Sequence, residues 1–457
     1  MTTRALVLTL CLAVAAPLGA AEPPSQPADE RVDVLKLSVV EMLARIAEGG
    51  QSMFNNERRA AALEDELRRA TDVRQKVGIG FTLAQELLAL GRTEEALSLL
   101  LEIRGVFERP GSNVHPDLLR QLGDRLAVAY LRLGEQDNCI AIHTAASCLL
   151  PISPEGRHRI ERGSRGAKAE LEALLRVEPE LGYRWLLNLA AMTLGEYPDG
   201  VAPEWRIPPE TFASEYPLAR FHDVAGATGT DVFGTSGGVV IEDLDGDGRL
   251  DLMVSAWGVK EQLVFLRNRG DGTFEDRTKA AGIIGEYGGL NLVHADYDND
   301  GDADVLVLRG AWLGPDGLYP DSLLQNQGDG TFKNVTREAG LLSFFPNQAA
   351  AFADYDLDGR LDLFVGNETM PGINSPCQLF HANPDGTFTN VAAQVGVDVE
   401  GFVKGAAWGD VDDDAGPIFI CRALASPTSS SATTARPRTA AGVLPRSPPR
   451  RGSPSRR

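Results

Sequence analysis

The chain has 457 residues, which is enough for two or three domains, each with its own hydrophobic core. Hydrophobic residues make up 43% of the sequence, so the chain as a whole is not disordered. A formal net charge of −20 argues against a nucleic-acid-binding protein, which needs a basic surface. The surplus of carboxylates favours a protein that binds divalent cations, because bound cations offset part of the repulsion between them.

The first residues have the pattern of a signal peptide. Arg4 supplies the positive charge, the stretch 6–16 is apolar, and small residues at 19–21 form a cleavage site. The apolar stretch is too short to span a bilayer, and no later segment has the roughly 18 uncharged apolar residues of a transmembrane helix. We therefore expect a signal peptide at residues 1–21. The mature protein is expected in the periplasm or outside the cell, with no integral membrane segment.

Four cysteines follow the signal peptide: Cys139, Cys148, Cys377 and Cys421. Cys139 and Cys148 are close enough in the sequence to form a local disulfide in an oxidising compartment. His143 lies between them, but the spacing does not match a CxxC or CxxCH motif for metal or haem. The sequence leaves two interpretations, a possible disulfide or two buried thiols.

Residues 31–200 have the apolar periodicity of helices. Three segments share an apolar helical face followed by Leu-Gly and a polar turn, and their glycines, Gly91, Gly134 and Gly195, are expected to adopt positive φ. This pattern resembles tetratricopeptide (TPR) hairpins, although the spacing departs from a strict repeat. It predicts a TPR-like helical domain for docking or scaffolding. The proline-rich residues 201–220 are interpreted as a linker.

Three nine-residue segments carry the clearest chemistry. DLDGDGRLD, DYDNDGDAD and DYDLDGRLD begin at Asp243, Asp296 and Asp354, with Asp at positions 1, 3, 5 and 9 and Gly at position 6. Alternate side chains of a tight loop converge on one point, as a hard cation such as Ca²⁺ requires, and the glycine permits the turn. Position 7 is expected to add a backbone carbonyl. The predicted ligands are Asp243, Asp245, Asp247, Arg249, Asp251, Asp296, Asp298, Asp300, Asp302, Asp304, Asp354, Asp356, Asp358, Arg360 and Asp362.

Two alternatives to these calcium loops are disfavoured. An EF-hand needs helices on both sides and a glutamate at position 12, but the first loop has strand-like neighbours, GGVVIE and LDLMVSA. Solvated acidic turns would not repeat the ninth aspartate in three copies. Calcium is favoured over magnesium because the loops form a nearly complete protein cage, whereas magnesium keeps several waters.

The loops belong to a longer repeat. Their first aspartates, at 243, 296, 354 and 410, are separated by 53, 58 and 56 residues. After each of the first three loops come an apolar strand, an Asn, a Gly-rich turn and another strand, and a partial copy of the end of this unit, FHDVAGATG, begins at Phe221. Four short strands in about 50 residues are typical of a propeller blade. Residues 221–414 are therefore predicted to form an incomplete calcium-binding β-propeller of about three and a half blades.

These motifs resemble the FG-GAP or VCBS repeats of integrin-like propellers. The order of helical region, Cys139–Cys148 segment, RWLLNLAAMTLGEYPDG and blades resembles the bacterial relatives of cartilage acidic protein, in which an ASPIC/UnbV module follows the blades. The resemblance covers about residues 130–414. It implies a secreted protein with calcium-stabilised blades that acts in cell adhesion or in binding a protein or glycan.

The fourth loop begins like the others and then departs from them. Asp410, Asp412 and Asp414 are in place, but position 6 is Ala415 and position 9 is Ile418. Residues 415–457 contain eight arginines and no acidic residue, a composition that predicts disorder. Restoring one lost base would change the sequence after Asp414 to GRPDLYLS, which matches GRLDLMVS of the first loop. We therefore expect an out-of-frame tail at 415–457, a remnant metal site, and an exposed strand edge.

A non-enzymatic binding protein is the leading functional interpretation. The alternatives are an extracytoplasmic hydrolase or lyase whose site lies in further blades, and a TPR-type assembly scaffold. None of the six histidines lies in a nucleophile or metal-hydrolase motif. His294 is expected to face a blade interior or to pack beside the loop that begins at Asp296, and His381 is expected to be a strand residue.

Overall fold

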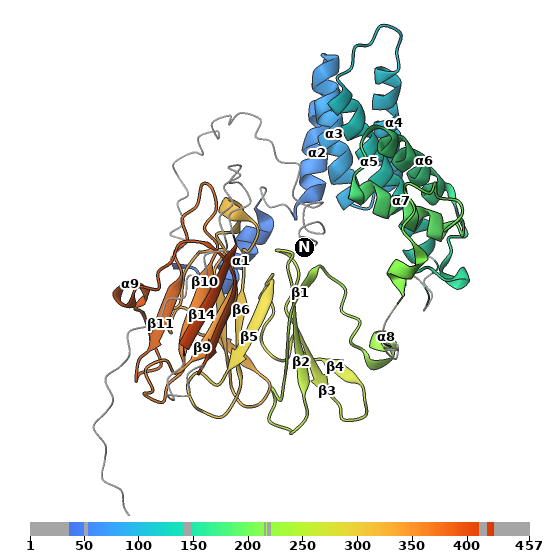
Figure 1. The fold of residues 1–457 in the computed structure, drawn as a ribbon. Coiled ribbons are helices and arrows are strands. Elements are labelled where there is room, and N and C mark those ends of the chain that lie inside the picture. Colours follow the sequence, from blue (N-terminus) through green and yellow to red (C-terminus); the bar gives the residue numbers. More distant parts are fainter. Residues whose placement is uncertain are drawn as a thin grey trace, which may run out of the picture. The chain divides into compact units, whose positions relative to one another are not determined.

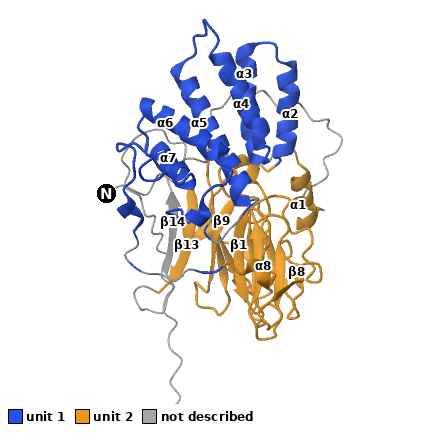
Figure 2. Ribbon diagram, turned by 90° about the vertical axis from the view of Figure 1, so that its right-hand side faces the viewer, with its two compact units in different colours: residues 1–26, 55–222 blue, residues 27–54, 223–457 orange. Residues whose placement is uncertain are grey.

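The computed structural model describes residues 36–49, 54–140, 142, 146, 149–213, 216 and 221–410, and the backbone of 418–424. The expected signal peptide and several residues named above, His143, Cys148, Asp412 and Asp414, lie outside the described residues. The chain divides into two compact units, residues 1–26 with 55–222 and residues 27–54 with 223–457 (Figure 2). The first unit is helical, and the second is built mainly of strands (Figure 1).

In the helical unit each helix packs against the next one in the sequence. The core contains leucines that are fully buried, Leu100, Leu126, Leu171 and Leu187, because each helix turns one apolar face inward. Among the described residues no helix is both long enough and apolar enough to cross a membrane. The helices are α2 (Asn56–Arg69), α3 (Val73–Ala89), α4 (Thr93–Phe107), α5 (Pro116–Gly134), α6 (Arg162–Val177) and α7 (Leu181–Thr193), with a π-helical turn at Glu135–Ile140.

Two of the three glycines that were expected at helix ends have the predicted positive φ angle. Gly91 and Gly195 adopt φ of 74° and 71°. The prediction for Gly134 is wrong, because this residue is the last of α5 and the chain continues directly into the π-helical turn. Its backbone lies close to α6, where glycine is needed at position 163: a Cβ on Gly163 would lie only 2.3 Å from the Gly134 nitrogen.

The segment interpreted as a linker is largely part of the helical unit. Val201 is 1% exposed and belongs to the core formed by α5, α6 and α7. The side chain of Asn188 donates to the Trp205 carbonyl at 2.8 Å and accepts from the Ile207 nitrogen at 3.0 Å. The linker prediction is therefore wrong for these residues, since a buried valine and a buried asparagine fix them against α7.

The second unit contains antiparallel sheets in which consecutive strands are neighbours. Sheet 1 comprises β1 (Ser236–Glu242), β2 (Asp251–Ala256), β3 (Val264–Asn268) and β4 (Phe274–Asp276). Sheet 2 comprises β5 (Asn291–Ala295), β6 (Asp304–Leu308), β7 (Ser322–Asn326) and β8 (Phe332–Asn334). Sheet 3 comprises β9 (Asn347–Ala353), β10 (Asp362–Asn367), β11 (Gln378–Ala382) and β12 (Phe388–Asn390). Sheet 4 comprises β13 (Phe402–Gly409) and β14 (Ile418–Leu424).

Successive sheets of this unit share their cores. One cluster joins Phe265 of sheet 1 to Val305 and Val307 of sheet 2, and the next joins sheet 2 to sheet 3. The first strands lie beside one another, and a Cβ on Gly238 of β1 would meet the Leu292 nitrogen of β5 at 2.4 Å. Because apolar side chains cover both faces of the inner sheets, each sheet depends on its neighbours for burial.

Strand β14 lies within the segment expected to be disordered. It pairs with β13 so that Ile418 is opposite Gly409, the same register that places Asp251 opposite Glu242 in sheet 1. The prediction of disorder is therefore wrong for residues 418–424. The apolar sequence Ile-Phe-Ile-Cys suits a strand, although the residues that follow it have a polar and proline-rich composition.

Helix α1 (Val39–Glu48) belongs to the sheet unit, although residues 31–200 were expected to form one helical domain. Ser38 and Glu41 form a capping box at its start. The Arg337 side chain donates to the Leu37 carbonyl at 2.6 Å, and Leu43 and Ile46 line a small cavity with residues of the loops next to the strands of sheets 1 and 2. The apolar face of α1 therefore covers the sheets.

Candidate metal centre

Each aspartate loop connects the first strand of a sheet to the second. The carboxylate of Asp243, at position 1, accepts from the backbone nitrogens of Asp247 and Gly248 at 3.1 and 2.8 Å. Asp296 accepts from positions 5 and 6 of the second loop at 3.0 and 3.0 Å, and Asp354 does so in the third loop at 2.9 and 2.8 Å. The position 1 side chain therefore holds all three loops in one conformation.

The aspartate at position 9 fastens the loop to the third strand. Asp304 is 1% exposed, and its carboxylate accepts from the nitrogens of Tyr297 and Asn326 at 3.1 and 2.8 Å. Asp251 and Asp362 are also buried and make the equivalent pair of hydrogen bonds. Burial raises the pKa of Asp304 to about 7 and that of Asp362 to about 6, because ionised carboxylates lose hydration there.

The loop backbone is left-handed at two positions. The residues at position 6 of the three loops are Gly248, Gly301 and Gly359. Their φ angles of 84°, 99° and 91° agree with the tight turn that a glycine at this position predicts. Position 4 also has positive φ, and there the residues are Gly246, Asn299 and Leu357, with φ of 72°, 61° and 60°. The second turn was not predicted, because only the first loop has glycine at position 4.

The structure brings subsets of the predicted ligands together. In each group one ligand atom per residue lies within 4.8 Å of the others. The groups are Asp243, Asp245 and Asp251; Asp296, Asp298 and Asp300; Asp354, Asp356 and Asp358; and Asp356, Asp362 and His381. The position 9 aspartate thus joins a group in the first and third loops, and position 5 joins in the second and third.

The side chains at position 7 differ between the loops in their charge and contacts. The side chains of Arg249 and Arg360 form ion pairs with the position 5 aspartates, Asp247 and Asp358. They also donate to carbonyls at the ends of β3 and β11, at 3.2 and 2.8 Å. The second loop has Asp302 at this position, so it carries one more carboxylate and no guanidinium.

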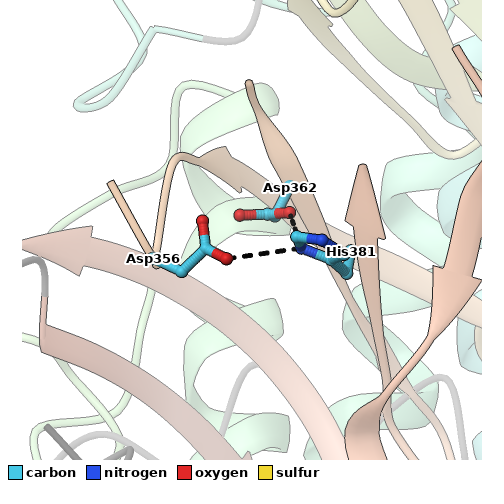
Figure 3. Close-up of side chains that lie close together, drawn as sticks. All are labelled: Asp356, Asp362 and His381. Atoms are coloured by element: carbon cyan, nitrogen blue, oxygen red, sulfur yellow. Dashed lines mark hydrogen bonds and ion pairs between the residues drawn. The ribbon is translucent and has the colours of Figure 1, made fainter. Parts of the chain in front are cut away.

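A residue of the third strand faces each loop, and these partners were missed from the sequence as site residues. Arg267 of β3 contacts Asp245 and Asp247, and Gln325 of β7 donates to Asp298 at 2.7 Å. His381 of β11 lies 3.0 Å from Asp362 and 3.7 Å from Asp356 (Figure 3). Each is the penultimate residue of its strand, a position that can be recognised only once the register of the strands is known.

Two carboxylate oxygens in these groups are buried without a hydrogen-bond partner. They are Oδ1 of Asp298 and Oδ1 of Asp356, at position 3 of the second and third loops. In the first loop the equivalent atom of Asp245 accepts from the Asp247 nitrogen at 3.3 Å. An unsatisfied buried carboxylate oxygen is unfavourable, and a hard cation would satisfy it, so the donor set of these loops fits such an ion.

The remaining candidate residues stand outside these groups. Asp410 of the remnant loop is exposed. His294 of β5 lies with its Nε2 3.6 Å from a carboxylate oxygen of Glu242, the last residue of β1. The Cys139 sulfur lies 3.6 Å from His158 Nε2, and because Cys148 is outside the described residues, the disulfide stays a prediction.

The repeated sheets and their aspartate loops define a protein with FG-GAP-like repeats. The family model of the FG-GAP-like repeat matches residues 243–307 and 312–365, which include all three complete loops.

The chain is also similar to cartilage acidic protein 1. The human protein is 27% identical over 180 residues, which cover 36% of this chain and 26% of the relative. The mouse protein is 26% identical over 180 residues, which cover 36% of this chain and 27% of the relative. The Xenopus tropicalis protein is 31% identical over 108 residues, which cover 23% of this chain and 16% of the relative. The matched region thus spans about a quarter or less of the length of these relatives.

Proposed function

We propose that the chain is an exported calcium-binding β-propeller protein that binds a protein or glycan partner and catalyses no reaction. The observation that carries the calcium assignment is the pair of unpartnered buried oxygens, on Asp298 and Asp356, each within a group of carboxylates. The FG-GAP-like repeats and the similarity to cartilage acidic protein 1 support a binding or adhesion role outside the cell.

In this proposal the residues of a loop have distinct tasks. The carboxylates at positions 1 and 3 hold the ion, together with position 9 in the first loop, position 5 in the second, and positions 5 and 9 in the third. Position 1 also closes the loop through its two backbone hydrogen bonds. Position 9 ties the loop to the third strand. Bound calcium would supply the positive charge that offsets the repulsion among these carboxylates, and it would thereby stiffen one end of each sheet.

The test is calcium titration of the purified chain by calorimetry, together with thermal melting in calcium and in EDTA. We expect heat of binding and a lower melting temperature in EDTA, because an ion that binds only the native state stabilises it. Asp298→Asn and Asp356→Asn should each remove one site. Asp316→Asn, an exposed aspartate outside the loops, is the matched control.

Two results would overturn the calcium assignment. One is a calcium titration without heat together with a melting temperature that EDTA leaves unchanged. The other is calcium binding of equal stoichiometry in the two loop variants and in Asp316→Asn, which would place the ions elsewhere.

A further inference from the structure

In the helical unit, away from the aspartate loops, a cysteine lies beside a histidine. Cys139 belongs to the π-helical turn that follows α5, and its sulfur lies 3.6 Å from His158 Nε2. Both residues are half-buried. The thiolate is the nucleophilic form of cysteine, and an imidazole at this distance is a base that can take the thiol proton.

The side chain of Asn138 holds the two residues together. Asn138 is 6% exposed, and its Oδ1 accepts from the backbone nitrogens of Arg159 and Ile160 at 2.7 and 2.9 Å. Its Nδ2 donates to the Ile160 carbonyl at 2.9 Å. The segment that carries His158 is therefore fixed against the turn that carries Cys139.

A chain of hydrogen bonds determines which nitrogen of His158 carries the hydrogen. The Thr193 hydroxyl has one hydrogen and lies 2.8 Å from both the Ala190 carbonyl oxygen and Ser164 Oγ. Because a carbonyl oxygen can only accept, Thr193 donates to Ala190, and the Ser164 hydroxyl donates to Thr193. Ser164 Oγ then accepts from His158 Nδ1, which lies 2.8 Å away. In the neutral imidazole Nε2 is therefore unprotonated, and it faces the Cys139 sulfur.

Burial keeps this imidazole neutral. Loss of hydration lowers the pKa of His158, and the carboxylates of Glu135 and Asp137 oppose this effect. Each of these carboxylates forms an ion pair with an arginine, Arg132 or Arg162. The neutral imidazole is the form that can act as a general base toward the thiol.

The surroundings of the pair favour a small electrophile. The cavity beside it has a volume of about 20 Å³, and Asn138, Ile142 and Arg159 are among the residues that line it. This volume holds about one water molecule and not the body of a substrate. Displacement at a disulfide needs only access to the attacking sulfur, whereas acyl transfer needs donors placed around the reacting carbonyl. A small disulfide is therefore the electrophile that suits this half-buried thiol.

We propose that Cys139 is a modification site, at which the thiol reacts with a small-molecule disulfide to form a mixed disulfide. His158 Nε2 takes the thiol proton, and the Cys139 sulfur attacks one sulfur of the ligand. The S–S bond of the ligand breaks, and the leaving thiolate takes the proton from the imidazolium. Cys139 is thereby oxidised and half of the ligand is released as a reduced thiol, so no further oxidant is needed.

In this reaction His158 is the base, and Ser164 is a positioning residue that acts through Nδ1. The reaction consumes one thiol in each chain, so it is a modification and not catalysis. It goes beyond the binding function proposed above and is independent of calcium.

The experiment incubates the full chain with glutathione disulfide at about pH 7 and follows the mixed disulfide at Cys139 by fragment-ion mass spectrometry. His158→Gln should react at least about tenfold more slowly, because the base is lost. Ser164→Ala should react about threefold more slowly, because the imidazolium loses a hydrogen bond. His115→Gln is the matched control, since His115 is exposed at the start of α5, and it should react like the unsubstituted chain.

The pH profile distinguishes a base from a residue that only maintains the structure. In His158→Gln the rate should follow the ionisation of an isolated thiol, near about pH 8.5, whereas in the unsubstituted chain it should rise at lower pH. Above about pH 10 the variants should react alike, because the thiolate then forms without a base. Should circular dichroism show that His158→Gln does not fold, the profile of Ser164→Ala decides.

The inference is wrong if millimolar glutathione disulfide leaves Cys139 unmodified, or if Ser164→Ala and His115→Gln have the same rates and pH profiles. It is also wrong if mass spectrometry of the purified chain finds Cys139 already bonded to Cys148, the disulfide that the sequence allows.

Discussion

At the scale of single residues, Leu357 occupies a backbone conformation that side chains with a Cβ rarely adopt. Its φ is 60°, it is 58% exposed, and the equivalent residue of the first loop is Gly246. The left-handed conformation is unfavourable by about 1–2 kcal/mol for a residue other than glycine. We expect Leu357→Gly to raise the free energy of unfolding by about 1 kcal/mol.

Urea denaturation measures this change. The control is Leu250→Gly, because Leu250 is 55% exposed in the first loop and is not among the residues with positive φ. That control should lower stability, since glycine there only increases the freedom of the unfolded chain. A loss of stability in both variants would contradict the argument.

A second residue-scale prediction concerns Asp321, which is 6% exposed. It accepts from the Arg309 nitrogen at 3.0 Å and from Asn347 Nδ2 at 2.8 Å, and burial raises its pKa from 3.8 to about 7. The native state therefore holds this proton more strongly than the unfolded chain does. The stabilisation is fully present below about pH 4 and is lost as the pH rises to about 7.

We expect Asp321→Asn to lose less stability than the unsubstituted chain between about pH 4 and pH 7, by on the order of a few kcal/mol. Urea denaturation at several pH values measures the difference, with Asp316→Asn as the control. Parallel stability curves for the unsubstituted chain and Asp321→Asn would contradict the prediction.

At the scale of elements, the third strand gives each aspartate loop a different neighbour. In the first loop, the guanidinium of Arg267 contacts Asp245 and Asp247. In the second loop, the corresponding residue is Gln325, which contributes a neutral amide. Because a fixed cation opposes a bound one, Arg267→Gln should tighten calcium binding at the first loop, by about tenfold. Calorimetry compares it with Arg269→Gln, an exposed arginine beyond the end of β3. Unchanged or weaker affinity in Arg267→Gln would contradict this effect.

The loop pattern is local, and for that reason much of it was predictable. The spacing of the aspartates predicted the loops, in which subsets of the side chains come together, and the strand-like sequences beside the loops are β1, β2 and their equivalents. Arg267, Gln325 and His381 were missed because they reach the loops only through the pairing of the second and third strands. The left-handed turn at position 4 was missed because the residues there in the second and third loops, Asn299 and Leu357, do not indicate a positive φ as a glycine would.

At the scale of the whole molecule, helix α1 shows what periodicity does not determine. Its apolar face resembles that of the helices that follow it, but the residues that cover it are about two hundred or more positions away, in the loops next to the strands of sheets 1 and 2. Leu43 is 3% exposed, so Leu43→Ala should destabilise the sheet unit by about 2–5 kcal/mol.

Hydrogen exchange locates this loss. Amides of β5 and β6 should lose protection in Leu43→Ala, whereas those of α3 and α4 should keep theirs. Leu101→Ala, at a position of α4 that is 42% exposed, is the control and should change neither set appreciably. Equal loss of protection in both units would contradict the assignment of α1 to the sheets.

The end of the described chain gives another prediction at this scale. Sheet 4 has two strands in the described region, and Ile418 stands where sheets 1 to 3 have the buried position 9 aspartate. The sequence predicts that one base was lost after Asp414, and restoring it would place Asp at that position. We expect a higher yield of soluble monomer by size-exclusion chromatography, because fewer strand edges are left unpaired. Equal yields of the two forms would count against the frameshift.

The separation of α1 from its partners also has a consequence for synthesis. After Glu48 the ribosome adds 187 residues before the first strand of sheet 1 begins at Ser236. Helices α2 to α7 lie entirely within that interval, so they can fold while Val39, Met42 and Leu43 still expose their apolar side chains. Docking of α1 is thus a late event that closes a contact between residues 37 and 337, and a nascent chain stalled before sheet 2 would be a substrate for chaperones.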